Sequence, residues 1–203
     1  MTPSRALLAL AAALASVACA PVQVNRMDVK EQKDLSGRWN DTDARLVAEE
    51  MIGDSLARPW LPTAQQRLKR TPTVIVGGVR NQSMEHINTD TFVEELQRAL
   101  INSGQVSFVA SKDERLQLRE ERLDQDANAS DATRKAHGEE QGADYVLSGA
   151  INTIQDEASG ISGSEKVVFY QVNLKLLDVK TSQIVWNGQK QIKKNVVRAP
   201  VTW

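Results

Sequence analysis

The chain has 203 residues, and its 26 acidic and 25 basic side chains leave a formal net charge of −1. This balance excludes a strongly basic binder of nucleic acid or anionic lipid, and an aromatic content of 4% offers few side chains for base stacking. The apolar share of 41% is sufficient for a single domain with a hydrophobic core.

The chain begins with the pattern of a secretory signal. Arg5 precedes an apolar run from Ala6 to Ala18, which is shorter than the roughly 20 residues of a membrane span. The run ends in "SVAC", which resembles the lipobox of bacterial lipoproteins, where cleavage falls before an acylated cysteine. We therefore expect a signal peptide at 1–18 and a lipid on Cys19. The alternative is an ordinary signal with a chance cysteine or a small buried thiol. Ala20 follows Cys19, and lipoproteins without aspartate there are usually sorted to the outer membrane, facing the periplasm.

Residues 19–34 have mixed charge and little apolar periodicity, which predicts a lipidated start followed by a short flexible tether. About 15 residues reach at most roughly 50 Å when extended, and about 20–25 Å as a coil. The folded domain is therefore expected to stay near the membrane that holds the lipid. We expect that domain at 35–197 and a tail at 198–203.

Helical periodicity begins near Asp41 or Thr42, either of which is a suitable N-cap. One apolar face follows, and Pro59 is expected to end the helix near Arg58. The face consists of Ala44, Val47, Ala48, Met51 and Ile52. A short β-rich run, Thr73 to Val76, then predicts a buried strand, and the Gly77–Gly78 pair predicts a bulge or close packing.

The middle of the chain predicts more helices around a second strand. Thr91 and Glu94 fit a capping box, and Gly104 fits a C-terminal cap. The helix between them has an apolar face of Phe92, Leu96, Ala99 and Leu100. A strand is expected at Val106 to Val109, then a charged surface helix at Lys112 to Asp124 and another from Ser130 to about Gly142.

The last third predicts three strands, beginning with "ADYVLSGAINTI" and continuing as a hairpin turned at "DVKTSQ". In the second strand one face holds Val168, Tyr170, Val172, Leu174 and Leu176. In the third, Ile184, Trp186 and Ile192 are expected to share a face, and Tyr170 and Trp186 to lie in the core. The fold class is therefore α/β or α+β, with a mixed, mainly antiparallel sheet of four to five strands flanked by helices.

No catalytic constellation is evident. The two histidines, His86 and His137, have no nucleophile suggested beside them, and with one cysteine they make a poor zinc ligand set. An acid/base pair on distant elements stays open. We expect no enzyme, no cofactor and no metal. Binding is expected instead in the polar segment between a strand and a helix, where Arg80, Asn81, Glu85 and His86 are the candidate partner contacts.

Several blocks together resemble the LpoB-type activators of penicillin-binding proteins. These blocks are "DLSGRWNDTDARLVAEEMI", "VIVGGVRNQSMEHINTDTFVEELQRALINSG", "GADYVLSGAI", "VFYQVNLKLLDVKTSQIVWNG" and "KQIKK". The resemblance covers about Asp34 to Lys194, and the fold it implies is similar to the N-terminal domain of TolB and to curli-secretion lipoproteins of the CsgG type.

The resemblance implies a non-enzymatic outer-membrane lipoprotein that binds and activates a bifunctional peptidoglycan synthase, a class A penicillin-binding protein. Enterobacterial members have a long proline-rich tether, whereas the tether expected here is short. Either the synthase projects outward, or the protein sits in the inner membrane, or the partner differs. The alternative function is an envelope assembly or secretion lipoprotein of the CsgG type, or another periplasmic binding module. The candidate contact residues come from the loop itself and are not transferred from the family.

Overall fold

The computed structural model describes residues 24–28, 31–129, 141–160 and 163–200. The chain divides into two compact units, 1–33 and 34–203, and all the described helices and strands belong to the second. Cys19, His137 and the helix expected from Ser130 lie outside the described residues. No helix in the described part of the chain is both long enough and apolar enough to cross a membrane.

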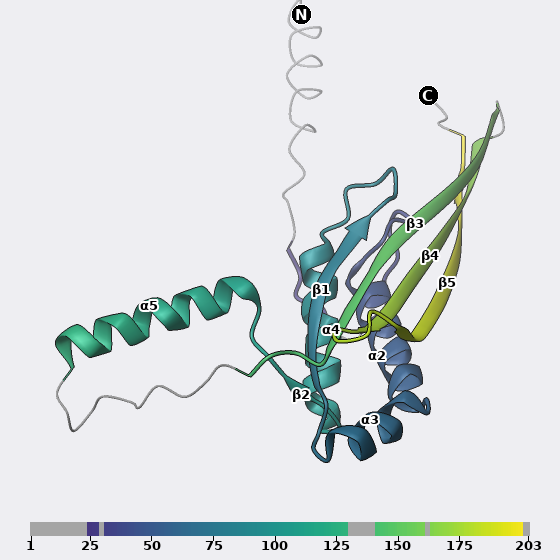
Figure 1. Ribbon diagram of the computed structural model, residues 1–203. Helices are drawn as coiled ribbons and strands as arrows, with labels where there is room; N and C mark the ends of the chain where they lie inside the picture. The colour runs from purple at the N-terminus through teal and green to yellow at the C-terminus, as the bar shows by residue number, and fades with distance from the viewer. Residues whose placement is uncertain (1–23, 29–30, 130–140, 161–162, 201–203) are drawn as a thin grey trace, which may run out of the picture. The chain divides into compact units, whose positions relative to one another are not determined.

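The second unit is an α+β fold whose elements are drawn in Figure 1. Its described helices are α2 (Asp41–Leu56), α3 (Trp60–Leu68), α4 (Thr89–Ser103) and α5 (Lys112–Asn128). Its strands are β1 (Thr73–Asn81), β2 (Ser107–Phe108), β3 (Tyr145–Gly160), β4 (Gly163–Asp178) and β5 (Ile184–Arg198).

The strands form one five-stranded sheet in the order β2-β1-β3-β4-β5. The pairs β2/β1 and β1/β3 are parallel, while β3/β4 and β4/β5 are long antiparallel pairs. The expected mixed, mainly antiparallel sheet is confirmed. The register shifts between Val76 and Val79, so the Gly77–Gly78 pair lies at the irregularity that the sequence predicts.

The hydrophobic core lies between α2, α3 and α4 and one face of the sheet, and α2 and α4 lie behind the strands in Figure 1. The predicted apolar face of α2 is buried, as is the alternating set of β4. Trp39, just before α2, packs its ring against Phe92 of α4 and Tyr170 of β4. Tyr170 is fully buried and Trp186 is 6% exposed, so their expected core positions are confirmed.

The predicted starts of the first two helices are displaced. Asn40, not Asp41 or Thr42, caps α2, because Asn40 has extended backbone and its side chain accepts a hydrogen bond from the Asp43 N–H. Asn88 caps α4, which therefore begins before the predicted Thr91–Glu94 capping box. Gly104 does end α4, with a φ of 64° that suits glycine.

Further differences concern one additional helix, the limits of two elements and the face on which Ile184 lies. Helix α3 was not predicted; its Trp60, Leu61 and Ala64 are buried, and Trp60 packs edge-on to Tyr145. Strand β2 is two residues long, and the surface helix extends to Asn128 with no buried residue. Ile184 is 54% exposed, contrary to expectation, because a register shift after Leu176 pairs Ile184 with Leu177 on the other face of the sheet.

Candidate functional site: a braced loop between β1 and α4

Residues 82–88 connect β1 to α4 and form a loop held by its own polar groups. The Asn81 side chain donates to the Glu85 carbonyl at 2.7 Å and accepts from the Ser83 N–H at 2.9 Å. The Ser83 hydroxyl accepts from the Glu85 N–H at 3.1 Å. These local bonds fix the loop without a regular element. Its apex residue Met84 is 93% exposed, whereas Ile87 is buried below it.

Glu85 ties this loop to three distant parts of the chain. Its Oε2 accepts from the Tyr170 hydroxyl at 2.7 Å and lies 3.5 Å from the Trp39 N–H, and its Oε1 accepts from Gln155 at 3.0 Å. Burial, followed by the bond to Glu85, raises the pKa of Tyr170 far above its ordinary value. Tyr170 therefore stays protonated and acts as a donor, and the carboxylate of Glu85 serves to brace the loop.

A shallow pocket of about 300 Å³ opens beside the loop. It is lined by Arg38, Trp39, Met84, Glu85, His86, Gln155 and Lys166. Two of the four candidate contacts, Glu85 and His86, therefore lie together at this pocket, with His86 exposed. Asn81 supports the loop from below, and Arg80 pairs with Ala150 on the sheet face opposite to the core.

A lysine-centred cluster secures the segment that leads into α2. The Lys194 ammonium donates to Asp43 at 2.6 Å, to Asp34 at 2.7 Å and to the Arg38 carbonyl at 3.2 Å. Burial alone would lower the pKa of Lys194, but the hydrogen bonds to the two carboxylates outweigh it and raise the pKa. The lysine is thus charged at all physiological pH values and holds residues 34–38 against β5.

Gly37 lets this segment pass close to the sheet. Its φ is 68°, and a Cβ at this position would lie 2.2 Å from a methyl group of Val196. Its carbonyl oxygen lies 3.1 Å from the Tyr170 hydroxyl, so the segment meets the same buried tyrosine that braces Glu85. The segment before α2 and the loop before α4 therefore share one support.

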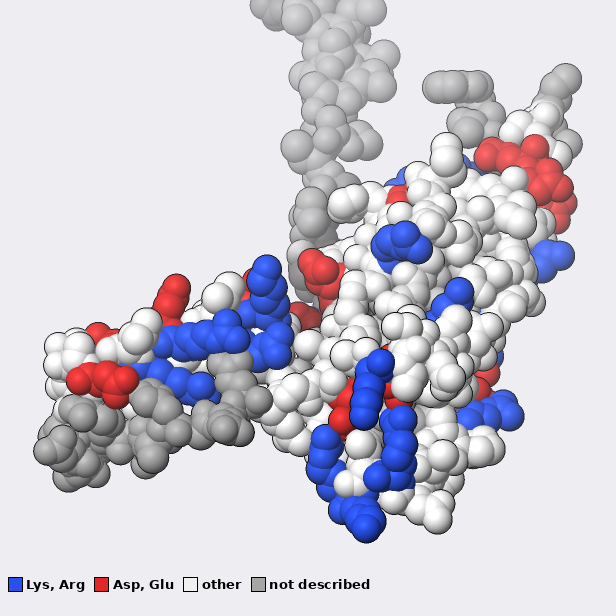
Figure 2. All heavy atoms as spheres, in the orientation of Figure 1, with Lys and Arg blue, Asp and Glu red and all other residues white. Residues whose placement is uncertain are grey.

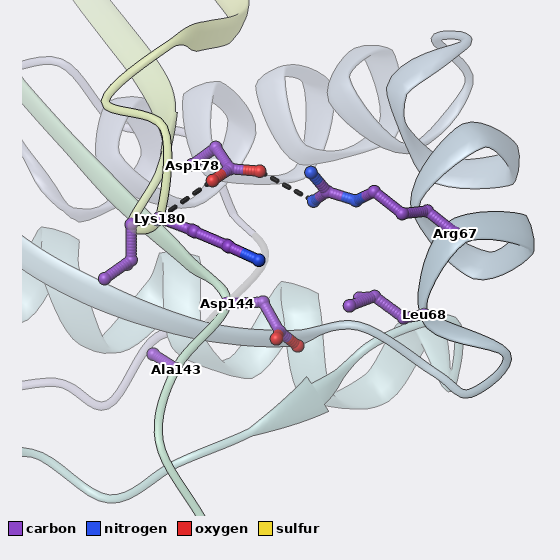
Figure 3. Close-up of a pocket in the computed structure, with 7 residues that line it drawn as sticks. Arg67, Leu68, Ala143, Asp144, Asp178 and Lys180 are labelled. Atoms are coloured by element: carbon purple, nitrogen blue, oxygen red, sulfur yellow. Dashed lines mark hydrogen bonds and ion pairs between the residues drawn. The ribbon is translucent and has the colours of Figure 1, made fainter.

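A second pocket, of about 320 Å³, lies beside α3 and the β4–β5 turn. Figure 3 shows Arg67 directed at Asp178, whose carboxylate accepts from Arg67 at 2.6 Å and from the Lys180 N–H at 2.9 Å. Burial alone would raise the pKa of Asp178, but hydrogen bonds from Arg67 and the Thr181 N–H outweigh it and lower the pKa. The ion pair between Arg67 and Asp178 indicates a clamp between α3 and the turn.

Both pockets contain acidic side chains. The acidic groups that line them are already hydrogen-bonded, and within the described residues no three His, Cys, Asp or Glu side chains gather as a metal site would require. The sequence predicted the loop but not Met84, because an isolated exposed methionine has no distinguishing pattern. In the structure, Met84 is recognised by its high exposed fraction on a loop whose backbone is held in place.

The fold and the site define a class: an α+β domain that presents a braced, pre-formed loop between a strand and a helix. The family described as peptidoglycan-synthase activator LpoB matches residues 43–192, and the chain belongs to this family. The resemblance read from the sequence is confirmed.

Solved structures include related domains. The LpoB C-terminal domain from Escherichia coli is 18% identical, with 75% of this chain and 99% of that chain covered and a TM-score of 0.43. The corresponding domain from Salmonella enterica is 17% identical, with the same coverage of 75% and 99% and a TM-score of 0.42. A PelC dodecamer from Paraburkholderia phytofirmans is 21% identical, with 61% and 72% covered and a TM-score of 0.31. A comparison with curated proteins finds no match.

Proposed function

We propose that this protein binds and activates a bifunctional peptidoglycan synthase, and that the loop 82–88 is part of the contact. Family membership over residues 43–192 supports the class of partner. The observation that carries the contact is Met84, a large apolar side chain 93% exposed on a braced loop. Methionine adapts to irregular apolar surfaces, and a loop already fixed in place loses little entropy on binding.

Activation of this kind is linkage between binding and conformation. A ligand shifts a synthase toward its active state only by its differential affinity for that state. The domain needs no catalytic group for this role. The braced loop meets the physical requirement, because a fixed contact surface discriminates between two partner conformations better than one that adjusts to both.

The experiment compares Met84→Ser with wild type, using the purified bifunctional synthases of the same organism. We expect Met84→Ser to weaken binding about tenfold, because it removes an apolar anchor worth roughly 1.4 kcal/mol. Stimulation of glycan polymerisation should fall in parallel, with an unchanged melting temperature. His86→Ala, at the adjoining pocket, should act in the same direction.

The matched control is Ile101→Ser, which removes another exposed apolar side chain, 52% exposed, on α4. This variant should bind and stimulate as wild type does. If Met84→Ser and Ile101→Ser behave alike, the loop is not the contact. If the wild-type protein stimulates none of the synthases, the activator role itself is wrong.

We further propose a lipid anchor on Cys19 that holds the protein in the outer membrane, facing the periplasm. Labelling cells with a radioactive fatty acid should mark the wild-type protein, and Cys19→Ser should lose the mark. Membrane fractionation of the same cells then distinguishes outer-membrane from inner-membrane anchorage. The short tether makes this measurement decisive for how the domain meets its partner.

A further inference from the structure

The face of the sheet that points away from α2, α3 and α4 has an unusual composition. The antiparallel registers place its residues in successive rows across β3, β4 and β5. Three neighbouring rows contain six carboxamide side chains, at Asn152, Gln171, Asn173, Asn187, Gln189 and Gln191. An open sheet face is commonly polar, but charged residues would serve that purpose equally well.

These carboxamides keep most of their hydrogen-bonding capacity. Gln171 donates to Asn173 at 3.2 Å, and Gln191 donates to Gln171 at 3.4 Å. Within the described residues, the side chains of Asn152, Asn187 and Gln189 have no hydrogen-bond partner. Each carboxamide offers two donors and one acceptor oxygen, so the three rows present a dense and uncharged set of both.

The charged residues in these three rows and in the row beside them have one sign. Three exposed basic residues lie here. Two of them, Arg80 and Lys175, lie in the patch rows, and Lys193 lies in the row next to them. Among the described residues none of the three forms an ion pair or a side-chain hydrogen bond. Toward the β3–β4 turn, the first acidic residue on this face is Asp156, one row beyond Phe169. In Figure 2 most of this face is uncharged, with separate basic groups on it, acidic groups toward that turn, and further acidic atoms among basic groups at the lower end.

An apolar margin completes the surface. Phe169 and Ile154 form the row beside Asn152 and Gln171, and Ile154 is 67% exposed. A flat surface that combines amide donors and acceptors with an aromatic ring suits a sugar, whose hydroxyl and acetamido groups need both partners and whose ring has an apolar face. The separate basic side chains suit carboxylates spaced along the same polymer.

We infer that this open face binds a glycan strand of acetamido sugars that carries carboxylate-bearing peptides. The inference rests on the proposed function, because that function places the domain beside the polymer that its partner makes. The loop 82–88 adjoins this face, where the Gln82 N–H donates to the Ile151 carbonyl, and its exposed Met84 stays available for the synthase. The domain then contacts enzyme and product together.

The test uses the full chain in mild detergent and purified, insoluble peptidoglycan as the probe. Wild-type protein should co-sediment saturably and be released by soluble glycan-peptide fragments. Gln189→Glu combined with Gln191→Glu keeps side-chain size but adds two negative charges, and should weaken binding about tenfold through repulsion of the carboxylates. Gln66→Glu on α3 is the matched control and should bind as wild type does.

A second variant guards against misfolding of the first. Lys175→Gln combined with Lys193→Gln removes two exposed charges without burying anything, and should weaken binding several-fold at low salt and less at high salt. Melting temperatures of all variants should match that of wild type. Short neutral oligomers of N-acetylglucosamine should still compete, though more weakly than fragments with peptides.

Failures of the two proposals are distinguishable. Stimulation of the synthase without co-sedimentation would overturn the glycan inference and leave the activator role intact. Co-sedimentation that polyglutamate abolishes and acetamido-sugar oligomers leave untouched would also overturn it, since the face would then bind only negative charge. Co-sedimentation lost in the Glu variants, with no stimulation of any synthase, would retain the glycan site and remove the activator role.

Discussion

Tyr170 is the residue on which the candidate site depends most. Its buried hydroxyl donates to Glu85 and lies beside the Gly37 carbonyl, so it supports both the loop and the segment before α2. We expect Tyr170→Phe to lower the free energy of unfolding by about 2 kcal/mol, because the half-buried carboxylate of Glu85 loses its donor and the buried Gly37 carbonyl loses its polar neighbour. Tyr145→Phe is the matched control and should cost less, because Arg67, the partner of Tyr145, is half-exposed and also bound to Asp178. Chemical denaturation measures both.

The same tyrosine predicts a local effect that a general loss of stability does not explain. Without its donor, Glu85 no longer holds the loop, so amide hydrogen exchange of residues 83–87 should speed up more than exchange in β4. Equal acceleration in the loop and in β4 would show that Tyr170 supports the core and not the loop.

Asp178 predicts a pH dependence. Its pKa is lower in the folded chain than the unfolded value of about 3.9, despite a burial that opposes this. Its contribution to stability is therefore present above about pH 4 and lost as the pH falls through the folded pKa. Asp178→Asn keeps an oxygen for the Lys180 and Thr181 N–H groups but loses the charge that Arg67 meets. The stability difference between wild type and Asp178→Asn should be largest near pH 6 and shrink below about pH 3. A difference that stays constant over this range would rule out the ion pair as its source.

At the scale of elements, the long β3–β4 pair depends on a close approach at Gly149. A Cβ there would lie 2.2 Å from the backbone carbonyl oxygen of Asn173, which cannot move without breaking the ladder. We expect Gly149→Ala to cost about 3 kcal/mol. Gly78→Ala, in β1, meets nothing within 4 Å and should be nearly neutral. Thermal unfolding of the pair checks this, and a neutral Gly149→Ala would mean that the strands separate locally without penalty.

Elements with strong periodicity could be predicted from the sequence, and their ends could not. The buried sets of α2 and β4 were correct because they repeat at 3.6 and 2 residues. The caps were wrong because Asn40, Asp41 and Thr42 are all suitable cap types, and only the backbone shows which one is extended. Helix α3 was missed because its nine residues include Pro62, which reads as a helix breaker although it stands in the first turn, where proline is tolerated.

The candidate site was predictable only in part. The loop could be placed from its polar composition between a strand and a helix, which is a local pattern. Its bracing depends on Glu85 meeting Tyr170, which is 85 residues away, and on Gln155, which is 70 residues away. The sheet register determines which residues so far apart in the sequence come into contact, and no local sequence pattern predicts such a contact.

At the scale of the whole molecule, the folded unit begins at residue 34, earlier than the family match at residue 43. Residues 34–42, which precede the family match, supply the Asn40 cap, the Trp39 ring contacts and the Asp34 bond to Lys194. We expect a chain of residues 34–203 to match the full chain in melting temperature. A chain of residues 43–203 loses the cap, worth about 1 kcal/mol, and leaves the pocket around Phe92 and Tyr170 without its ring.

The shorter chain should therefore melt at least several degrees lower than the chain of residues 34–203, because a deficit of a few kcal/mol is large for a domain of this size. The loop adds a functional consequence, since Glu85 would lose the Trp39 N–H and Tyr170 would lose the Gly37 carbonyl. Stimulation of the synthase should fall in the shorter chain even at temperatures where it is fully folded. Equal stimulation by the two chains would show that the loop binds the synthase without support from the segment before α2. The hydrogen bonds from that segment would then contribute to stability and not to binding.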